Sequence, residues 1–269
     1  MTKPIDSLRA MGPGQLLFAL AMAGLGVLGL VYGDFALQWQ PVPPGLPWRQ
    51  GIAYLAGIIS LAGGVGVLIK PVAARSALAL TLVLLVTWVF PQALKAAPDP
   101  ASVGSWVGFC ETLAVLTGGW ILWTSLARTT GATPIVDGGG LRIARCLFGL
   151  SCVVFGLSHF VYADFTASMI PHWIPLRLWF AYATGAGHIA AGLGITLSVR
   201  PRLAATLEAL MMSSFVLLLH IPSLWTAPPP DWAPSARIQW TALFWASAIA
   251  GSAWIVARSL RDRPWGARA

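Results

Sequence analysis

Residues 15–32 read QLLFALAMAGLGVLGLVY, and none of them carries a charge. A helix of about 20 apolar residues spans the hydrocarbon core of a bilayer. Strands of a membrane barrel would be shorter and would alternate polar with apolar residues. The stretch therefore predicts a transmembrane helix. Seven further segments of the same kind follow it, at residues 51–69, 76–94, 103–126, 141–161, 178–199, 203–221 and 238–257.

The composition of the whole chain favours the same class of protein. Of its 269 residues, 57% are hydrophobic and 10% are charged, whereas soluble domains carry about 25% charged residues. So few charges cannot cover the water-exposed surface of a chain this long. With three cysteines and this apolar content, disordered proteins and disulfide scaffolds are also excluded. We predict an all-α, polytopic membrane protein with eight transmembrane helices.

The basic side chains predict the orientation. In an eight-span layout, thirteen of the 17 Lys and Arg residues fall on one side, and loops rich in Lys and Arg stay in the cytoplasm. We therefore expect both termini in the cytoplasm. Because these residues are scattered over helix ends rather than gathered in a patch, they indicate contact with the lipid bilayer and no nucleic-acid partner. The four on the other side are Arg49, Lys95, Arg177 and Arg237.

The chain contains an internal repeat. The sequence VYGDF at residues 31–35 returns as VYADF at 161–165, and Pro71 returns as Pro201 at the same separation. Each copy contains four predicted spans, an even number, so the two copies share one orientation. We expect two parallel four-helix units, at residues 1–130 and 141–269, joined by a Gly-rich cytoplasmic connector at 131–140. Glycines at small-residue spacing on the second span of each unit indicate close packing of helices.

The second unit contains four distinctive motifs: GLSHF at residues 156–160, MIPHWIP at 169–175, GAGHIAAGL at 185–193 and FVLLLHIP at 215–222. Together these motifs resemble the DoxX-like membrane proteins of bacteria. The resemblance implies a four-helix unit in the bacterial inner (plasma) membrane, and this chain would be a double-length member of the family. Some relatives are linked to quinone-coupled sulfur oxidation. Many members carry a glutamate in the second helix of the unit, where this chain has His188 or Ser60.

All four histidines lie in the second unit, and a fold requirement common to both units would not need them. Polar groups in hydrocarbon are costly and usually face the bundle interior or a wet cavity. We predict an outward-facing pocket in the second unit, with His188 about 15 Å deep at its floor. The competing interpretations are helix packing for His188, capping for Asp164 and an interfacial belt for the tryptophans. The candidate pocket residues are His159, His188, His220, Asp164, His172 and Trp173.

Several chemistries remain open for this pocket. An apolar pocket with aromatic walls and one or two hydrogen-bonding groups fits a quinone or another small apolar molecule, with which a histidine can exchange a proton. The spacing of the histidines and cysteines favours neither a metal site nor a haem. Glu111 and Glu208 both lie within predicted spans. Three interpretations are open for them: a proton relay, pairing of each with an arginine, or protonation of each carboxyl group.

Three function classes follow from this pattern. The first is a redox-associated protein that binds a quinone or small apolar molecule. The second is a non-enzymatic transporter or binding protein for a small molecule. The third is a structural subunit whose membrane or redox partner performs the chemistry. The sequence does not decide whether the chain is an enzyme.

Overall fold

The computed structural model describes residues 11–129, 138–225 and 235–266, and the elements of these residues are all helical. Seven helical segments are long and apolar enough to cross a membrane, so the chain is an all-α, multi-pass membrane protein. They are α2 (Pro13–Tyr32), α3 (Arg49–Val67), α4 with its continuations (Ala73–Ala96), α6 (Val103–Thr129), α7 (Gly138–Val161), α10 with its continuations (Pro201–Ser223) and α12 (Ala236–Ser259).

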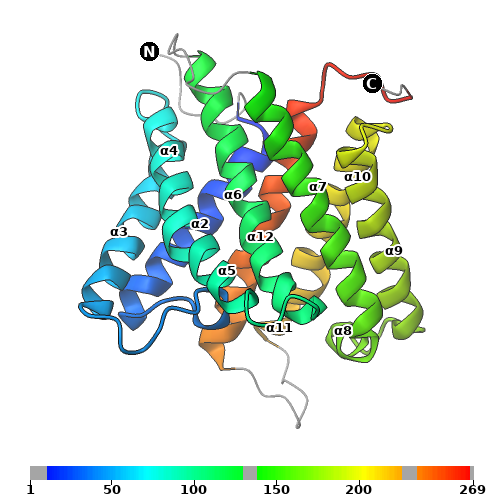
Figure 1. Ribbon diagram of the computed structural model, residues 1–269, viewed down its shortest axis with the longest axis horizontal. Helices are drawn as coiled ribbons and strands as arrows, with labels where there is room; N and C mark the ends of the chain where they lie inside the picture. Colours follow the sequence, from blue (N-terminus) through cyan, green and yellow to red (C-terminus); the bar gives the residue numbers. More distant parts are fainter. Residues whose placement is uncertain (1–10, 130–137, 226–234, 267–269) are drawn as a thin grey trace.

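The remaining long helix is α9 (Arg177–Thr196), which the sequence predicts as a further span. It packs against α7 and α10 and runs along them in Figure 1. It is not among the seven apolar segments. His188 and several glycines replace aliphatic side chains in α9 and lower its hydropathy. α9 therefore differs from the seven apolar segments in composition rather than in length.

The helices are arranged around a central pair, α6 and α12. Neighbouring contacts run in the order α2, α3, α4, α6, α7, α9, α10 and α12, and α12 returns to contact α2. In addition, α6 contacts α12, and these two are the most deeply buried of the apolar segments, at 61% and 72%. The last long helix of each half thus packs against the first helix of the other half, so α6 and α12 join the two halves.

The first described helix begins, and the last one ends, on the same side of the molecule. The start of α2 and the end of α12 lie at one end of the molecule in Figure 1. We call this the terminal end, and we call the opposite end, which carries α8 (Ala163–Met169), the loop end. Most of the expected connector at residues 131–140 lies outside the described residues. Its last three residues, 138–140, instead form the first turn of α7, because a helix satisfies its own backbone bonds beyond the apolar segment.

Glycines bring the paired helices into backbone contact, as their spacing in the sequence predicts. A Cβ placed on Gly57 of α3 would lie 3.3 Å from the Gly26 carbonyl oxygen of α2. A Cβ on Gly185 of α9 would lie 3.1 Å from the Gly156 carbonyl oxygen of α7. Small residues at such contacts let membrane helices approach closely. The α2–α3 and α7–α9 pairs therefore pack in the same manner.

One π-helical turn interrupts the third long helix of each half. The turn η2 (Leu85–Val89) leads into α5 (Phe90–Ala96), and η3 (Val216–His220) leads into α11 (Ile221–Ser223). In each case proline is the second residue after the turn. Proline has no N–H to donate to the preceding turn, which favours a local widening of the helix. The two halves thus share this irregularity at corresponding places.

Candidate functional site

The deepest ionisable groups of the second half form one pair. His188 of α9 places its Nδ1 2.9 Å from Oε1 and 3.2 Å from Oε2 of Glu208 on α10. The two side chains are 2% and 0% exposed. Both residues lie some two to three helical turns from the short turn that joins the antiparallel helices, so they stand at the same level. The sequence marks each residue as a candidate, and the structure joins them.

His159 of α7 lies beside this pair. Its ring centroid is 5.1 Å from that of His188, with the rings nearly perpendicular. Its Nδ1 lies 3.2 Å from the Ala181 carbonyl oxygen and 2.9 Å from the Thr184 hydroxyl oxygen. Because a carbonyl oxygen can only accept a hydrogen bond, His159 carries a proton on Nδ1, and in its neutral form Nε2 is an acceptor. We call His159, His188 and Glu208 the His–Glu cluster.

Aromatic side chains enclose the His–Glu cluster. Phe155 of α7 meets the His188 ring edge to face at 5.8 Å, and Phe215 at the end of α10 lies 5.8 Å from the same ring. Phe215 also stacks on His159, at 6.3 Å. These rings occupy the space around His188, which the sequence places at the floor of an open pocket. His188 instead lies inside packed protein, and the half-buried His159 is the member of the cluster nearest to the surface.

The first half has no such cluster at the corresponding place. Ser60 stands 128 positions before His188, the separation of Gly57 and Gly185, and it is buried. Leu78 stands 130 positions before Glu208, the separation of Pro71 and Pro201, and it is half-buried. The position of His159 is taken by Gly29. Gly29 and Ser60 line a small cavity of about 20 Å³, which is room for one water molecule. The ionisable groups are therefore particular to the second half and are not needed for this helix arrangement.

The other predicted residues of the second half lie apart from the cluster. His220 is the last residue of η3, and among the described residues no hydrogen bond or ring contact joins it to His159 or His188. His172 and Trp173 lie exposed in the segment between α8 and α9, with Trp173 70% exposed. The structure therefore brings together two of the four histidines.

Glu111 of α6 belongs to a different polar cluster, between the two halves. Its Oε2 accepts a hydrogen bond from Nε1 of Trp245 on α12, at 3.2 Å. The Trp245 ring stacks on Trp88 of η2 at 4.3 Å, with the planes 4° apart. The sequence suggests that Glu111 and Glu208 form one proton relay. In the structure, the two residues have separate hydrogen-bond partners.

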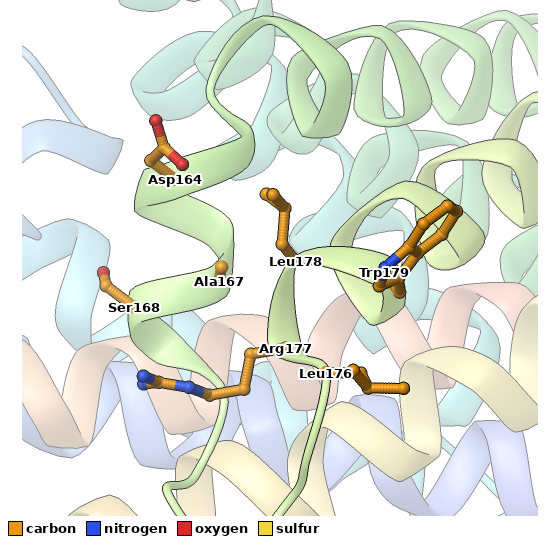
Figure 2. Close-up of a pocket in the computed structure, with 7 residues that line it drawn as sticks. All are labelled: Asp164, Ala167, Ser168, Leu176, Arg177, Leu178 and Trp179. Atoms are coloured by element: carbon orange, nitrogen blue, oxygen red, sulfur yellow. The ribbon is translucent and has the colours of Figure 1, made fainter.

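An open cavity of about 440 Å³ lies at the loop end of the second half (Figure 2). Asp164 lines it, but none of its lining residues is a histidine. Arg177, Ser168 and Trp179 also line it. Sequence reasoning missed Arg177 and Ser168 as pocket residues. The available signal was that Arg49 recurs as Arg177, near the repeated aspartate.

Comparisons of the chain with family models, with curated proteins and with solved structures found no match. Among the residues that the structure describes, no group of three or more His, Cys, Asp or Glu side chains is arranged to hold a metal ion.

Proposed function

We propose that this chain is a DoxX-like inner-membrane protein whose second unit binds a small, lipid-soluble molecule of the quinone–quinol class and exchanges a proton with it. The observation that carries the proposal is the contact series from His159 to His188 to Glu208. Ionisable residues inside a membrane bundle are costly and are usually functional. The series runs from a half-buried imidazole to a fully buried carboxylate.

The proposed layout has eight spans, with α9 as the sixth, and both termini in the cytoplasm of a bacterium. The Lys and Arg distribution supports this orientation, because Lys70, Arg75, Arg142 and Arg200 all lie near helix ends at the terminal end. The paired π-helical turns and paired glycine contacts support two parallel units, at residues 1–130 and 141–269. A reporter fused after Ala269 should be active only in the cytoplasm, and periplasmic activity would contradict this layout.

The hydrogen bonds of His159 support a ligand that carries a hydroxyl group. With Nδ1 donating to Ala181 and Thr184, Nε2 accepts, so it suits a ligand hydroxyl such as that of a quinol. When bound, such a ligand would supply a proton-releasing hydroxyl on a flat ring. Beside His159, Phe160 and Tyr182 form a stacked and exposed aromatic pair at 5.6 Å. Such a surface matches a flat ring that arrives from the bilayer.

His188 and Glu208 would act behind His159 as the destination of the proton. A carboxylate that accepts from Nδ1 stabilises positive charge on an imidazole. Within the bundle, where water is scarce, this attraction is stronger than in water. Glu208 thus places a carboxyl group directly behind His188. In this scheme His159 contacts the ligand, and His188 and Glu208 hold the charge.

The experiment is binding of a short-chain quinol to the purified full chain in lipid nanodiscs, followed by quenching of tryptophan fluorescence. We expect His159→Ala to weaken binding about tenfold, which corresponds to the loss of one hydrogen bond of about 1.4 kcal/mol. His220→Ala is the matched control, because His220 is a second-unit histidine outside the cluster. Equal affinity of His159→Ala and the unaltered protein, with both folded, would contradict the proposal.

A further inference from the structure

The first half closes its loop end with an ion pair. The Asp34 carboxylate pairs with the Arg49 guanidinium through Oδ1 and also accepts from the Phe35 backbone N–H at 2.7 Å. Arg237 of α12 approaches the other carboxylate oxygen, at 3.9 Å. Asp34 is thus surrounded by partners from three parts of the chain. Its charge is compensated within the protein.

The corresponding charged residues of the second half do not pair with each other. Asp164 and Arg177 stand 130 and 128 residues after Asp34 and Arg49. Among the described residues no ion pair joins them, and both line the open cavity of about 440 Å³. Figure 2 shows the Asp164 carboxylate and the Arg177 guanidinium at separate points of the cavity, with Ser168 of α8 between them.

One sequence difference accounts for this separation. Gly33 ends α2 with a left-handed backbone conformation, φ 58° and ψ 29°, which turns the chain so that Asp34 meets Arg49. Glycine adopts this conformation without steric cost, whereas other residues rarely do. The second half has Ala163 at this place, and there the chain enters α8 instead. Asp164 is consequently carried on a helix that the first half does not have.

We propose that this cavity binds a zwitterion that bears a primary ammonium and a phosphate, in the form of the headgroup of an aminophospholipid. The ammonium would donate to Asp164, and the phosphate would accept from Arg177, so that the ligand replaces the ion pair of the first half. Guanidinium binds phosphate through several N–H groups at once, and carboxylate is a strong acceptor for ammonium. The Ser168 hydroxyl donates to the Phe165 carbonyl oxygen, so its own oxygen can also accept from the ammonium.

The surroundings of the cavity favour a lipid over a free zwitterion. Leu176 and Trp179, which line it, are each 70% exposed, and Leu178 is 40% exposed. The cavity lies where the transmembrane helix α7 ends and α9 begins. Tryptophan at such a level is typical of the membrane interface, where headgroups lie. Acyl chains of a bound lipid would continue along the exposed apolar residues of α9.

The test compares lipids retained by the purified full chain, measured by native mass spectrometry. The probes are three lipids, phosphatidylethanolamine, phosphatidylcholine and phosphatidylglycerol, and the soluble compound phosphoethanolamine. The quaternary amine of phosphatidylcholine has no N–H, and the headgroup of phosphatidylglycerol has no cation. We expect phosphatidylethanolamine to bind at least about tenfold more tightly than the other two lipids, as for one charge-assisted hydrogen bond. Asp164→Asn should remove the preference over phosphatidylcholine, and Arg177→Gln should weaken all three lipids.

Asp262→Asn is the control, because Asp262 is an exposed acid beyond α12 at the terminal end. It should leave lipid retention unchanged. Equal retention of the three lipids, or an unchanged preference in folded Asp164→Asn, would overturn the proposal. Displacement of the lipid by soluble phosphoethanolamine at equal concentration would overturn its assignment to a lipid headgroup. This test does not involve His159 and is therefore independent of the proposed function.

Discussion

His188 and Glu208 form a hydrogen-bonded pair, 2.9 Å from Nδ1 to Oε1, that is almost completely removed from solvent. A buried ion pair often stabilises a fold no better than well-packed apolar residues of similar size do. In the first half, Ser60 and Leu78 occupy the matching positions, and neither is ionisable. The pair fits the proposed proton exchange, since the corresponding helices of the first half pack together without it.

Removal of one partner of the pair should be costly. His188→Ser leaves Glu208 buried without its hydrogen-bond donor, and we expect this substitution to lower the free energy of unfolding by about 3–5 kcal/mol. Adding Glu208→Leu reproduces the residues of the first half and should recover much of the loss. Thermal unfolding of the purified protein in one detergent measures both variants.

The double substitution separates a charge effect from simple loss of packing. If the two changes together destabilise as much as their separate effects added, Glu208 gains nothing from His188, and the pair has no coupling energy. That additivity would count against a charged, interacting pair.

Gly33 should tolerate no side chain. An alanine there would have to hold φ 58°, and its Cβ would lie 2.7 Å from the Tyr54 hydroxyl oxygen. We expect Gly33→Ala to lower the free energy of unfolding by about 1–2 kcal/mol from the backbone alone. Ala163→Gly, at the matching position in the second half, should cost about 1 kcal/mol or less. Thermal unfolding of both variants checks this, and equal effects would contradict the role assigned to Gly33.

The Trp245 indole should contribute more to the stability of the fold than the Trp254 indole on the same helix. Trp245 donates to the Glu111 carboxylate, whereas Trp254 donates to the Ser213 hydroxyl at 3.0 Å. Hydrogen bonds to charged groups contribute about 1.5–3 kcal/mol, and neutral ones about 1 kcal/mol. Trp245→Phe should therefore destabilise more than Trp254→Phe in a denaturation series. The reverse order would mean that Glu111 is not an important acceptor.

The sequence predicts the helices well because the bilayer constrains them strongly. The stretch at residues 15–32 is found as α2, Pro13–Tyr32, and the other expected spans end within a few residues of the observed helices. The one difference in class concerns α9, where His188 and glycines reduce the apolar character. A local pattern suffices for such elements because backbone hydrogen bonds in lipid must be satisfied within the segment.

The candidate site is less accessible from the sequence. His188 and Glu208 lie at similar distances along the chain from the turn that joins their helices, so their pairing can be worked out once α9 and α10 are known to be antiparallel. The separation of Asp164 from Arg177 depends on how one residue, Ala163 in place of Gly33, redirects the backbone. The contacts of α6 with α7 and of α12 with α2, which join the two halves, depend on tertiary packing, and no single segment encodes them.

The central claim is that a ligand proton reaches the His–Glu cluster. Infrared difference spectra of the full chain, recorded with and without a short-chain quinol, report changes in the charge and hydrogen bonding around buried carboxyl groups. The account predicts a carboxyl band that changes when the quinol binds, disappears in Glu208→Gln and persists in Glu111→Gln. A band that survives in Glu208→Gln, or a spectrum without any carboxyl change while the quinol is bound, would contradict it.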